Sequence, residues 1–360
     1  PGAADCALLP PLNSMKAALF REFQGQLTVE TVPDPVPTPT GVIIRVEATG
    51  VCRSDWHGWM GHDPEIHLPH VPGHEFAGVI EEIGDRVINW KSGDRVTAPF
   101  VCGCGTCRFC EAGDQQVCPH QFQPGFTAWG SFARFVMLEH AEENLVRLPQ
   151  DLDFTAAASL GCRLATSYRA VAHQARIRPG DWLAVHGCGG VGLSAIMIAS
   201  ALGARSIAVD IDPAKLSRAR QLGALETVDA SCEDVCPAII ALTGGGAHSS
   251  IDALGSSITA TNSINCLRPR GRHVQVGLMT GEDSRSTVPF DRIVSRELEL
   301  YGSHGMQAHC YHELFALIAQ GSLDPAQLVS RTTSLEEALP ALTAESSFGE
   351  TGIIVIDRIA

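Results

Sequence analysis

The pattern of hydrophobic and polar residues changes near residue 160. Between residue 15 and that point, short stretches such as 42–46 and 76–80 alternate apolar and polar positions, and Gly and Pro separate them closely. This spacing predicts short strands joined by turns. Four prolines that alternate with other residues between 33 and 39 exclude a helix there and predict an extended segment.

From about residue 164 the chain alternates apolar strands with helices of roughly ten residues, which predicts parallel βαβ units and an α/β fold. We expect strands at 182–186, 206–209, 250–253 and 273–276, and helices at 192–202 and 213–222. A further helix is expected at 310–320 and a closing strand at 352–356.

These patterns predict two domains. Residues 164–299 form a Rossmann-type cofactor domain with a doubly wound parallel sheet. Residues 15–163 and 300–360 together form a mainly-β catalytic domain. Met15 begins a stretch typical of a natural start, so residues 1–14 are interpreted as an extension or an artificial addition, and 345–350 as a solvated acidic turn.

Composition narrows the class of partner. The net charge of -14 and a pI of about 5.4 argue against nucleic acid and against an anionic membrane surface. The sequence shows no signal-peptide pattern and no apolar run of about 20 residues. The 13 cysteines cluster at metal-ligand spacing, which favours thiolate ligands in a reducing compartment and hence the cytoplasm.

A glycine-rich loop follows the strand expected at 182–186. The motif comprises Gly187, Gly189, Gly190, Val191 and Gly192, and Asp210 follows at the end of the next expected strand. Such glycines permit a tight turn and the approach of a pyrophosphate to a helix N-terminus. Asp210 is expected to bind the ribose and to repel a 2′-phosphate, which favours NAD, and Lys215 can reach the same ribose. The alternative is a glycine turn without nucleotide.

Two cysteine patterns indicate metal sites. Cys104, Cys107, Cys110 and Cys118 have the spacing of a closed structural zinc site. Cys102 offers a second register, but the interval from Cys104 to Cys107 is the usual one. Reduced core thiols without metal are the alternative.

Cys52 and His74 provide one sulfur and one nitrogen ligand, as an open catalytic zinc site requires. The third ligand must come from elsewhere, and Cys162, at the expected domain boundary, is the best candidate. Asp55 is expected to support these ligands, and Glu75 is either a supporting group or a transient ligand.

Side chains near the open site suggest roles in catalysis. Ser54 could hydrogen-bond an alcohol substrate, and His57 could pass its proton to solvent. Five apolar side chains are candidates for the substrate pocket, with plain core as the alternative: Trp56, Trp59, Phe100, Trp129 and Met306.

From Met15 onward the sequence resembles the zinc-dependent medium-chain alcohol dehydrogenases. The matching motifs are residues 50–55, 73–75, the four-cysteine run, 160–162 and 187–192. The resemblance implies a GroES-like catalytic domain, a catalytic zinc on Cys52, His74 and Cys162, and a proton relay through Ser54 and His57. It also implies that Arg53 contacts the cofactor pyrophosphate and that Phe100 lines the substrate pocket. Further residues are implied beside the nicotinamide: Thr166, Val191, Val276 and Gly277.

The resemblance implies reversible oxidation of alcohols to aldehydes or ketones with NAD and two zinc ions per chain, and apolar primary alcohols fit best. A polyol or other secondary-alcohol dehydrogenase is one alternative, and a non-catalytic relative with the same fold is another. The segment from Cys118 to Glu139 is short, as in tetrameric microbial members, so a homotetramer is expected, with a homodimer as the alternative. Many members carry an Arg near the C-terminus where this chain has Ile353.

Overall fold

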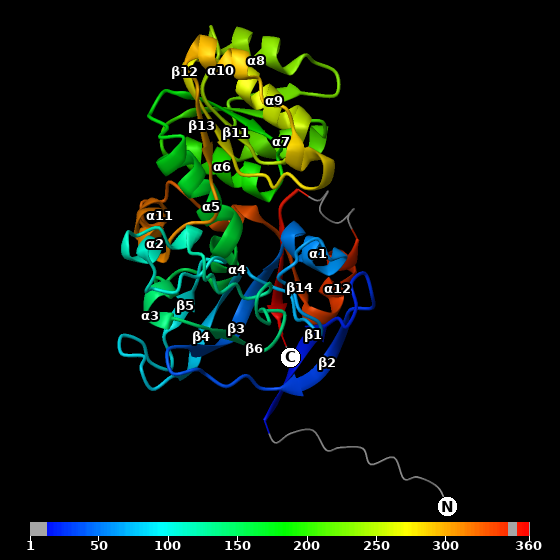
Figure 1. Cartoon of the computed structure of the whole chain (residues 1–360), viewed down its shortest axis with the longest axis vertical. Coiled ribbons are helices and arrows are strands. Elements are labelled where there is room, and N and C mark those ends of the chain that lie inside the picture. Colours follow the sequence, from blue (N-terminus) through cyan, green and yellow to red (C-terminus); the bar gives the residue numbers. More distant parts are fainter. Residues whose placement is uncertain (1–12, 345–350, 360) are drawn as a thin grey trace, which may run out of the picture.

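The structure is a computed structural model that describes residues 13–344 and 351–359. Residues 1–12 of the proposed extension 1–14 and the acidic turn at 345–350 lie outside the described residues, whereas Ser14 begins strand β1. Figure 1 shows two domains stacked along the long axis, with the cofactor domain above the catalytic domain. Within the described part of the chain, the helices are too short or too polar to cross a lipid bilayer.

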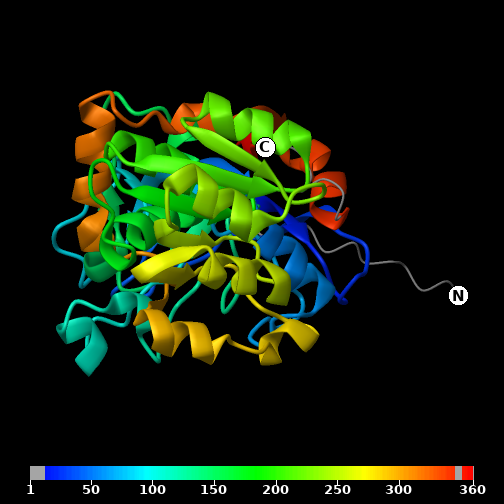
Figure 2. The same ribbon diagram turned by 90° about the horizontal axis from the view of Figure 1, so that it is seen from above.

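The cofactor domain is built on a six-stranded parallel sheet with the order β10-β9-β8-β11-β12-β13. Its strands are β8 (Trp182–His186), β9 (Arg205–Asp210), β10 (Glu226–Asp229), β11 (Ala247–Asp252), β12 (Leu267–Gln275) and β13 (Glu299–Gly302). The connecting helices are α6 (Gly190–Ala201), α7 (Pro213–Gln221), α8 (Val235–Thr243), α9 (Ser257–Asn265) and α10 (Phe290–Arg296). Figure 2 shows helices on both sides of the sheet. This confirms the predicted doubly wound fold.

The strand order reverses at β8, because β9 lies on one side of it and β11 on the other. At such a reversal the connecting helices leave to opposite faces, and a crevice opens at the carboxyl ends of the strands. The glycine motif begins at this end of β8. The topology therefore puts the predicted cofactor loop at the position where this fold binds ligands.

The catalytic domain contains a seven-stranded sheet with the order β14-β15-β3-β4-β5-β7, and β6 pairs with β3. Its strands are β3 (Val42–Val51), β4 (Phe76–Ile83), β5 (Arg95–Thr97), β6 (Phe135–Leu138), β7 (Val146–Arg147), β14 (Val329–Ser334) and β15 (Ile353–Arg358). A separate hairpin joins β1 (Ser14–Leu19) and β2 (Thr28–Pro33). β15 pairs antiparallel with β3, so segments from both ends of the chain form one sheet.

Most of the helices in the catalytic domain are short. They are α1 (Arg53–Met60), α2 (Arg108–Glu111), α3 (Ala141–Asn144), α11 (Tyr311–Ala319) and α12 (Leu335–Thr343). Near the predicted domain boundary a run of helical turns joins α4 (Phe154–Ala158), a π-helical turn (Leu160–Leu164), α5 (Ala165–Tyr168) and a second π segment (Arg169–Gln174). The π-helical turn contains Cys162. Such turns widen a helix locally and occur frequently at functional sites.

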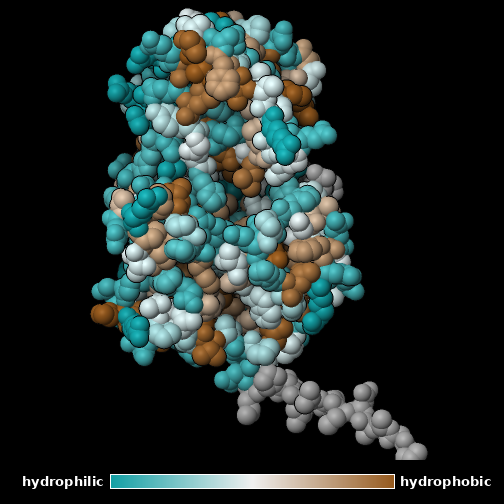
Figure 3. Space-filling model, viewed as in Figure 1, coloured by the Kyte–Doolittle hydropathy of each residue, from teal (hydrophilic) through white to brown (hydrophobic). Residues whose placement is uncertain are grey.

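One hydrophobic core continues through this helical run. Ala48 and Ala77 of the catalytic sheet belong to the same buried cluster as Leu164 and as Leu183 and Val185 of β8. The two domains are therefore packed against each other on this side. On the face drawn in Figure 3 the surface is hollowed between them.

Candidate active site

Asp55 organises the residues around Cys52 and His74. It lies in the first turn of α1, is almost fully buried, and accepts a hydrogen bond through Oδ2 from the Cys52 backbone N at 2.9 Å. Its Oδ1 accepts from the Gly73 backbone N at 3.0 Å and lies 2.9 Å from His74 Nδ1. The imidazole is thereby oriented with Nε2 away from the carboxylate. Burial lowers the pKa of His74, but Asp55 and Cys52 together outweigh that effect and raise it well above its ordinary value.

The structure brings Cys162 to these two residues. The ligand atoms of Cys52, His74 and Cys162, together with a carboxylate oxygen of Glu75, all lie within 4.8 Å of one another. His74 Nε2 is buried and has no hydrogen-bond partner among the described residues. A hydrogen bond with Cys162 lowers the pKa of Cys52 and raises that of Cys162. Two sulfurs and an unpartnered imidazole nitrogen are a donor set that fits zinc.

Glu75, the fourth member of the cluster, is fully buried and forms an ion pair with Arg163. Its Oε1 accepts from both the backbone N and the Nε of Arg163 at 2.9 Å, and its Oε2 accepts from Nε at 3.0 Å. Burial raises the pKa of Glu75, although the positive charge of Arg163 opposes that shift. No sequence pattern points to Arg163, because its partner Glu75 lies 88 positions away in the chain.

The second cluster is a surface loop that contains Cys104, Cys107, Cys110 and Cys118, whose sulfurs lie within 4.8 Å of one another. Cys107 Sγ is 3.6 Å from Cys110 Sγ and 3.7 Å from Cys118 Sγ. Backbone N–H groups of Cys104 and His120 donate to Cys118 Sγ at 3.4 and 3.3 Å. Four converging sulfurs with amide donors fit a closed zinc site.

The remaining cysteine of this region lies apart from the cluster. Cys102 is fully buried and its thiol donates to the Pro99 carbonyl at 3.3 Å. Burial raises the pKa of Cys102 above its ordinary value. Burial also acts to raise the pKa of Cys104, but hydrogen bonds from Thr106 and its neighbours lower it to about 6. This contrast fits Cys104 as the thiolate ligand and Cys102 as a neutral thiol.

The two residues predicted to move a proton, Ser54 and His57, both lie on α1. Ser54 Oγ is 3.8 Å from Cys52 Sγ, so the hydroxyl lies beside the cluster. His57 Nδ1 lies 2.9 Å from Nδ1 of the exposed His62, and both rings pack against Trp56. Arg53 lies over the same indole ring at 5.9 Å.

Aromatic rings enclose one side of His74. The ring centroids of Phe126 and Phe100 lie 4.9 and 6.0 Å from that of His74, and His304 lies 5.2 Å from Phe100. Of these residues, the sequence predicts Phe100 for the pocket and His304 only as a surface or cleft-lining histidine, and it offers no sign of Phe126. No spacing rule connects Phe126 or His304 with the metal ligands. Only the tertiary structure shows that Phe126 lies close to His74 and His304 close to Phe100.

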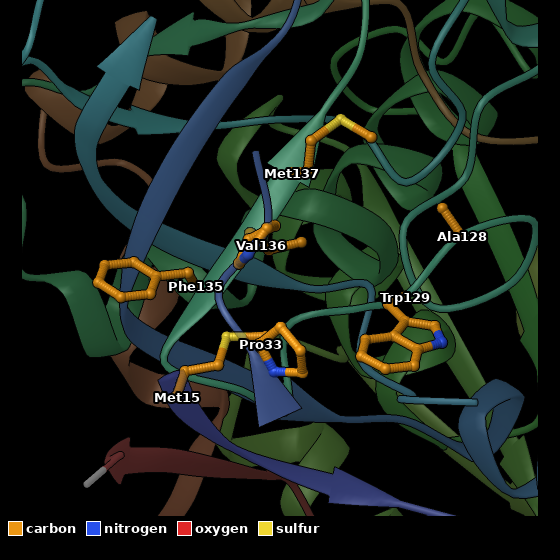
Figure 4. A pocket seen from close by; sticks show the side chains of 8 residues that line it. Met15, Pro33, Ala128, Trp129, Phe135, Val136 and Met137 are labelled. Atoms are coloured by element: carbon orange, nitrogen blue, oxygen red, sulfur yellow. The ribbon is translucent and has the colours of Figure 1, made fainter. Parts of the chain in front are cut away.

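The other predicted pocket residues lie in different surroundings. Trp59 packs on the core of the N-terminal hairpin and donates its indole N–H to the Gly25 carbonyl at 2.9 Å. Met306 is fully buried in the main core. Trp129 lines a shallow apolar surface pocket with Met15, Pro33 and residues of β6 (Figure 4). None of the residues around that pocket belongs to the metal cluster.

The glycine loop has the geometry that a close phosphate approach requires. Gly187 has a φ of +91°, which favours glycine, and a Cβ at Gly192 would lie 1.8 Å from the Gly187 carbonyl oxygen. A Cβ at Gly189 would meet no atom of the described residues within 4 Å. Gly187 and Gly192 therefore need to be glycine for the fold. Gly189 leaves open space at the N-terminus of α6.

Asp210 ends β9 beside this loop. Its carboxylate accepts hydrogen bonds from the Cys188 N at 2.7 Å and from the backbone of Ile211 at 2.8 Å, which fixes its position. Lys215 is close enough to lower the pKa of Cys188, which burial and Asp210 raise.

The predicted nicotinamide contacts come from two helices and one strand end: Thr166 lies on α5, Val191 on α6, and Val276 and Gly277 directly follow β12. The Thr166 hydroxyl is buried and has no hydrogen-bond partner within the described residues, as expected for a group that awaits a ligand. The adjacent Ser167 donates to the Val191 carbonyl at 2.8 Å. The N–H groups of Val276 and Gly277 both donate to the Asp252 carbonyl, at 3.0 and 2.8 Å.

Comparisons with known proteins identify the family. Residues 38–150 match the alcohol dehydrogenase GroES-like domain, and residues 190–320 match the zinc-binding dehydrogenase domain. An alcohol dehydrogenase of Rhizobium meliloti (strain 1021) is 37% identical over 272 residues, which are 75% of this chain and 78% of that protein. This chain belongs to the zinc-dependent medium-chain alcohol dehydrogenase family.

Other members of the family differ in substrate. A sorbitol dehydrogenase of Halalkalibacterium halodurans is 32% identical and covers 87% of this chain and 90% of its own length. The crystal structure of benzyl alcohol dehydrogenase from Acinetobacter calcoaceticus superposes with a TM-score of 0.89 at 27% identity, over 96% of this chain and all of the other. Membership therefore shows an alcohol dehydrogenase fold and leaves the substrate to the pocket.

Proposed function

We propose that this protein oxidises apolar primary alcohols, aliphatic or aromatic, to aldehydes by hydride transfer to NAD, and catalyses the reverse reduction. The observation that carries the proposal is the convergence of Cys52, His74 and Cys162 around a buried, unpartnered imidazole nitrogen. Three protein ligands leave one position for substrate, as catalytic zinc requires.

The residues of the chain would divide the work as follows. When bound, the zinc polarises the substrate oxygen and the nicotinamide accepts the hydride. Ser54 takes the alcohol proton beside the cluster, and His57 passes it toward solvent. Phe100 and Phe126 form an apolar wall beside His74, which favours substrates with an aliphatic or aromatic group and excludes water.

The cofactor and the assembly follow from further residues. Asp210 favours NAD, since its carboxylate would lie beside a 2′-phosphate, and Arg53 would neutralise the pyrophosphate. We propose one zinc in the catalytic cluster and a second in the four-cysteine loop. We also propose that the protein assembles as a homotetramer and that it lies in the cytoplasm, where thiols stay reduced.

A second candidate is the oxidation of polyols or other secondary alcohols, which the similarity to a sorbitol dehydrogenase favours. The resemblance stated above weighs against it, because polyol enzymes tend to use Glu as a ligand and often lack the His relay, whereas this chain has Cys162 and His57. A polyol would also place several hydroxyl groups against the phenylalanine wall without hydrogen-bond partners.

One paired measurement tests both candidates. Zinc per chain is determined on purified protein, and formation of reduced cofactor is followed with primary, secondary, aromatic and polyhydroxy alcohols. Two zinc ions and highest kcat/KM on apolar primary alcohols are expected, and a preference for polyols would select the second candidate. One zinc ion per chain and no turnover would instead favour a non-catalytic role.

The cofactor preference has its own test in Asp210→Gly. In this variant the preference for NAD over NADP should fall by about tenfold or more.

A further inference from the structure

The Arg163 side chain fills the space between the metal cluster and the dinucleotide loop. It directly follows Cys162 and is 7% exposed. Its stem lies against Gly190, the first residue of α6, where a Cβ would be 2.4 Å from Arg163 Cδ. A Cβ at Gly50 would be 3.0 Å from the Arg163 Nη2. Two glycines from distant segments therefore leave room for this one side chain.

Arg163 is committed almost entirely to one carboxylate. Its backbone N, Nε and Nη2 all donate to Glu75, so both carboxylate oxygens are engaged. Nη2 also donates to the Val51 carbonyl at 3.1 Å, which fixes the guanidinium plane. Charge-assisted contacts of this kind are the strongest and most directional hydrogen bonds in proteins.

The same carboxylate is close enough to act as a metal ligand. One of its oxygens lies within 4.8 Å of the ligand atoms of Cys52, His74 and Cys162. A fourth protein ligand would give a closed site, which is the arrangement of structural zinc, whereas a dehydrogenase needs an open position. The three proposed ligands do not by themselves prevent Glu75 from binding the metal as a fourth ligand.

We propose that Arg163 is a positioning residue that holds the Glu75 carboxylate out of the metal coordination sphere and keeps one position open for substrate. The inference rests on the proposed zinc at Cys52, His74 and Cys162 and adds what keeps that zinc accessible. Two thiolates balance the charge of zinc, and Arg163 balances Glu75. Without Arg163, the metal is the nearest cation available to a buried carboxylate.

The test uses Co²⁺ in place of zinc, because its visible absorption bands respond to the number of ligands, and imidazole as a probe of the open position. In cofactor-free Arg163→Met, the bands are expected to change and imidazole affinity to fall about tenfold. The double variant Arg163→Met, Glu75→Gln removes the competing carboxylate and should bind imidazole within about threefold of wild type. Circular dichroism and the metal content of the four-cysteine loop check that each variant is folded.

Two single variants keep the test decisive if Arg163→Met does not fold. Gly190→Ala displaces the Arg163 stem without removing its charge and should shift the bands in the same direction. Glu75→Gln alone should leave imidazole affinity within about threefold of wild type, because the held carboxylate does not compete. Much tighter imidazole binding by Glu75→Gln would show that Glu75 already competes and would overturn the proposal.

The outcome also separates this inference from the proposed function. Two Co²⁺ ions per wild-type chain with Arg163→Met spectra identical to wild type would overturn only the role of Arg163. A single Co²⁺ per wild-type chain, held by the four-cysteine loop, would overturn both the catalytic metal site and this inference.

Discussion

The two clusters of candidate metal ligands in this protein are assembled in opposite ways. The loop cluster draws all four sulfurs from residues 104–118 and steadies them with its own backbone N–H groups. The proposed catalytic cluster draws Cys52, His74 and Cys162 from three remote segments. The buried carboxylate of Asp55 holds the backbone of Cys52 and the ring of His74. Closing a short loop costs little entropy, whereas the second cluster exists only when the whole fold has formed. The first cluster therefore depends mainly on local structure, and the second depends on the whole fold.

The loop cluster also supports the pocket of the other. Gln307 donates to the Gly113 carbonyl at 3.1 Å, and His304 Nδ1 lies 3.4 Å from the Gln116 carbonyl oxygen. His304 in turn packs against Phe100 beside His74. The four-cysteine loop thus anchors a segment that borders the catalytic cluster, so the two clusters are linked through packing and hydrogen bonds.

The largest effect is expected for Cys162→Ser, which removes one ligand from the proposed catalytic cluster. Loss of one sulfur ligand from the catalytic cluster should lower kcat/KM by at least about 1,000-fold, because the metal is weakly held and its polarising effect is lost. Metal content should fall from two ions to one, and the melting temperature should change little. Retained turnover would remove Cys162 from the proposed zinc site.

Cys110→Ser applies the same change to the loop cluster, with an effect on stability rather than chemistry. Loss of the metal should free the loop and lower the melting temperature by about 5 °C. Turnover of the folded fraction should fall only severalfold, through loosened contacts at His304. A loss of turnover as large as that of Cys162→Ser, at an unchanged melting temperature, would erase the distinction between the two clusters.

Asp55→Asn tests whether the buried Asp55 carboxylate holds Cys52 and His74 in place. The amide keeps the shape but loses the charge that orients His74, so affinity for the catalytic metal should fall 10- to 100-fold in a chelator competition. The metal of the loop cluster should be unaffected. Asp94→Asn is the matched control, because Asp94 is also buried and paired, but with Arg147, and neither residue belongs to a metal cluster. An equal loss in the control would point to general loosening.

The same contrast explains what the sequence could reveal. Local spacing indicated the loop cluster and the glycine turn, and the expected strand at 182–186 coincides with β8. The helix expected at 192–202 begins earlier, at Gly190, and the strand expected at 273–276 begins at Leu267. Period and turn residues specify such elements because the interactions that form them are local.

Contacts between residues that are remote in the chain could not be predicted from the sequence pattern. Phe126 reaches His74, and Arg163 reaches Glu75 across 88 positions, only because sheet pairing and the π-helical turn bring those segments together. Trp59 shows the converse, since an aromatic next to a ligand motif packs on the N-terminal hairpin instead. Cys162 was predicted as the third ligand from the sequence before and after it, yet only the fold brings its sulfur to the cluster.

The smallest expected effect comes from Cys102→Ser, which tests the register of the loop cluster. Serine can donate to the same Pro99 carbonyl, so the cost should be about 1 kcal/mol for placing a more polar group in a buried site. Metal content should stay at two ions per chain and kcat/KM within about twofold of wild type. Loss of the loop metal would mean that Cys102 is a ligand in place of Cys104. The comparison would then change, because Cys102 belongs to a hydrophobic core cluster of the catalytic domain and would tie the loop metal directly to that core.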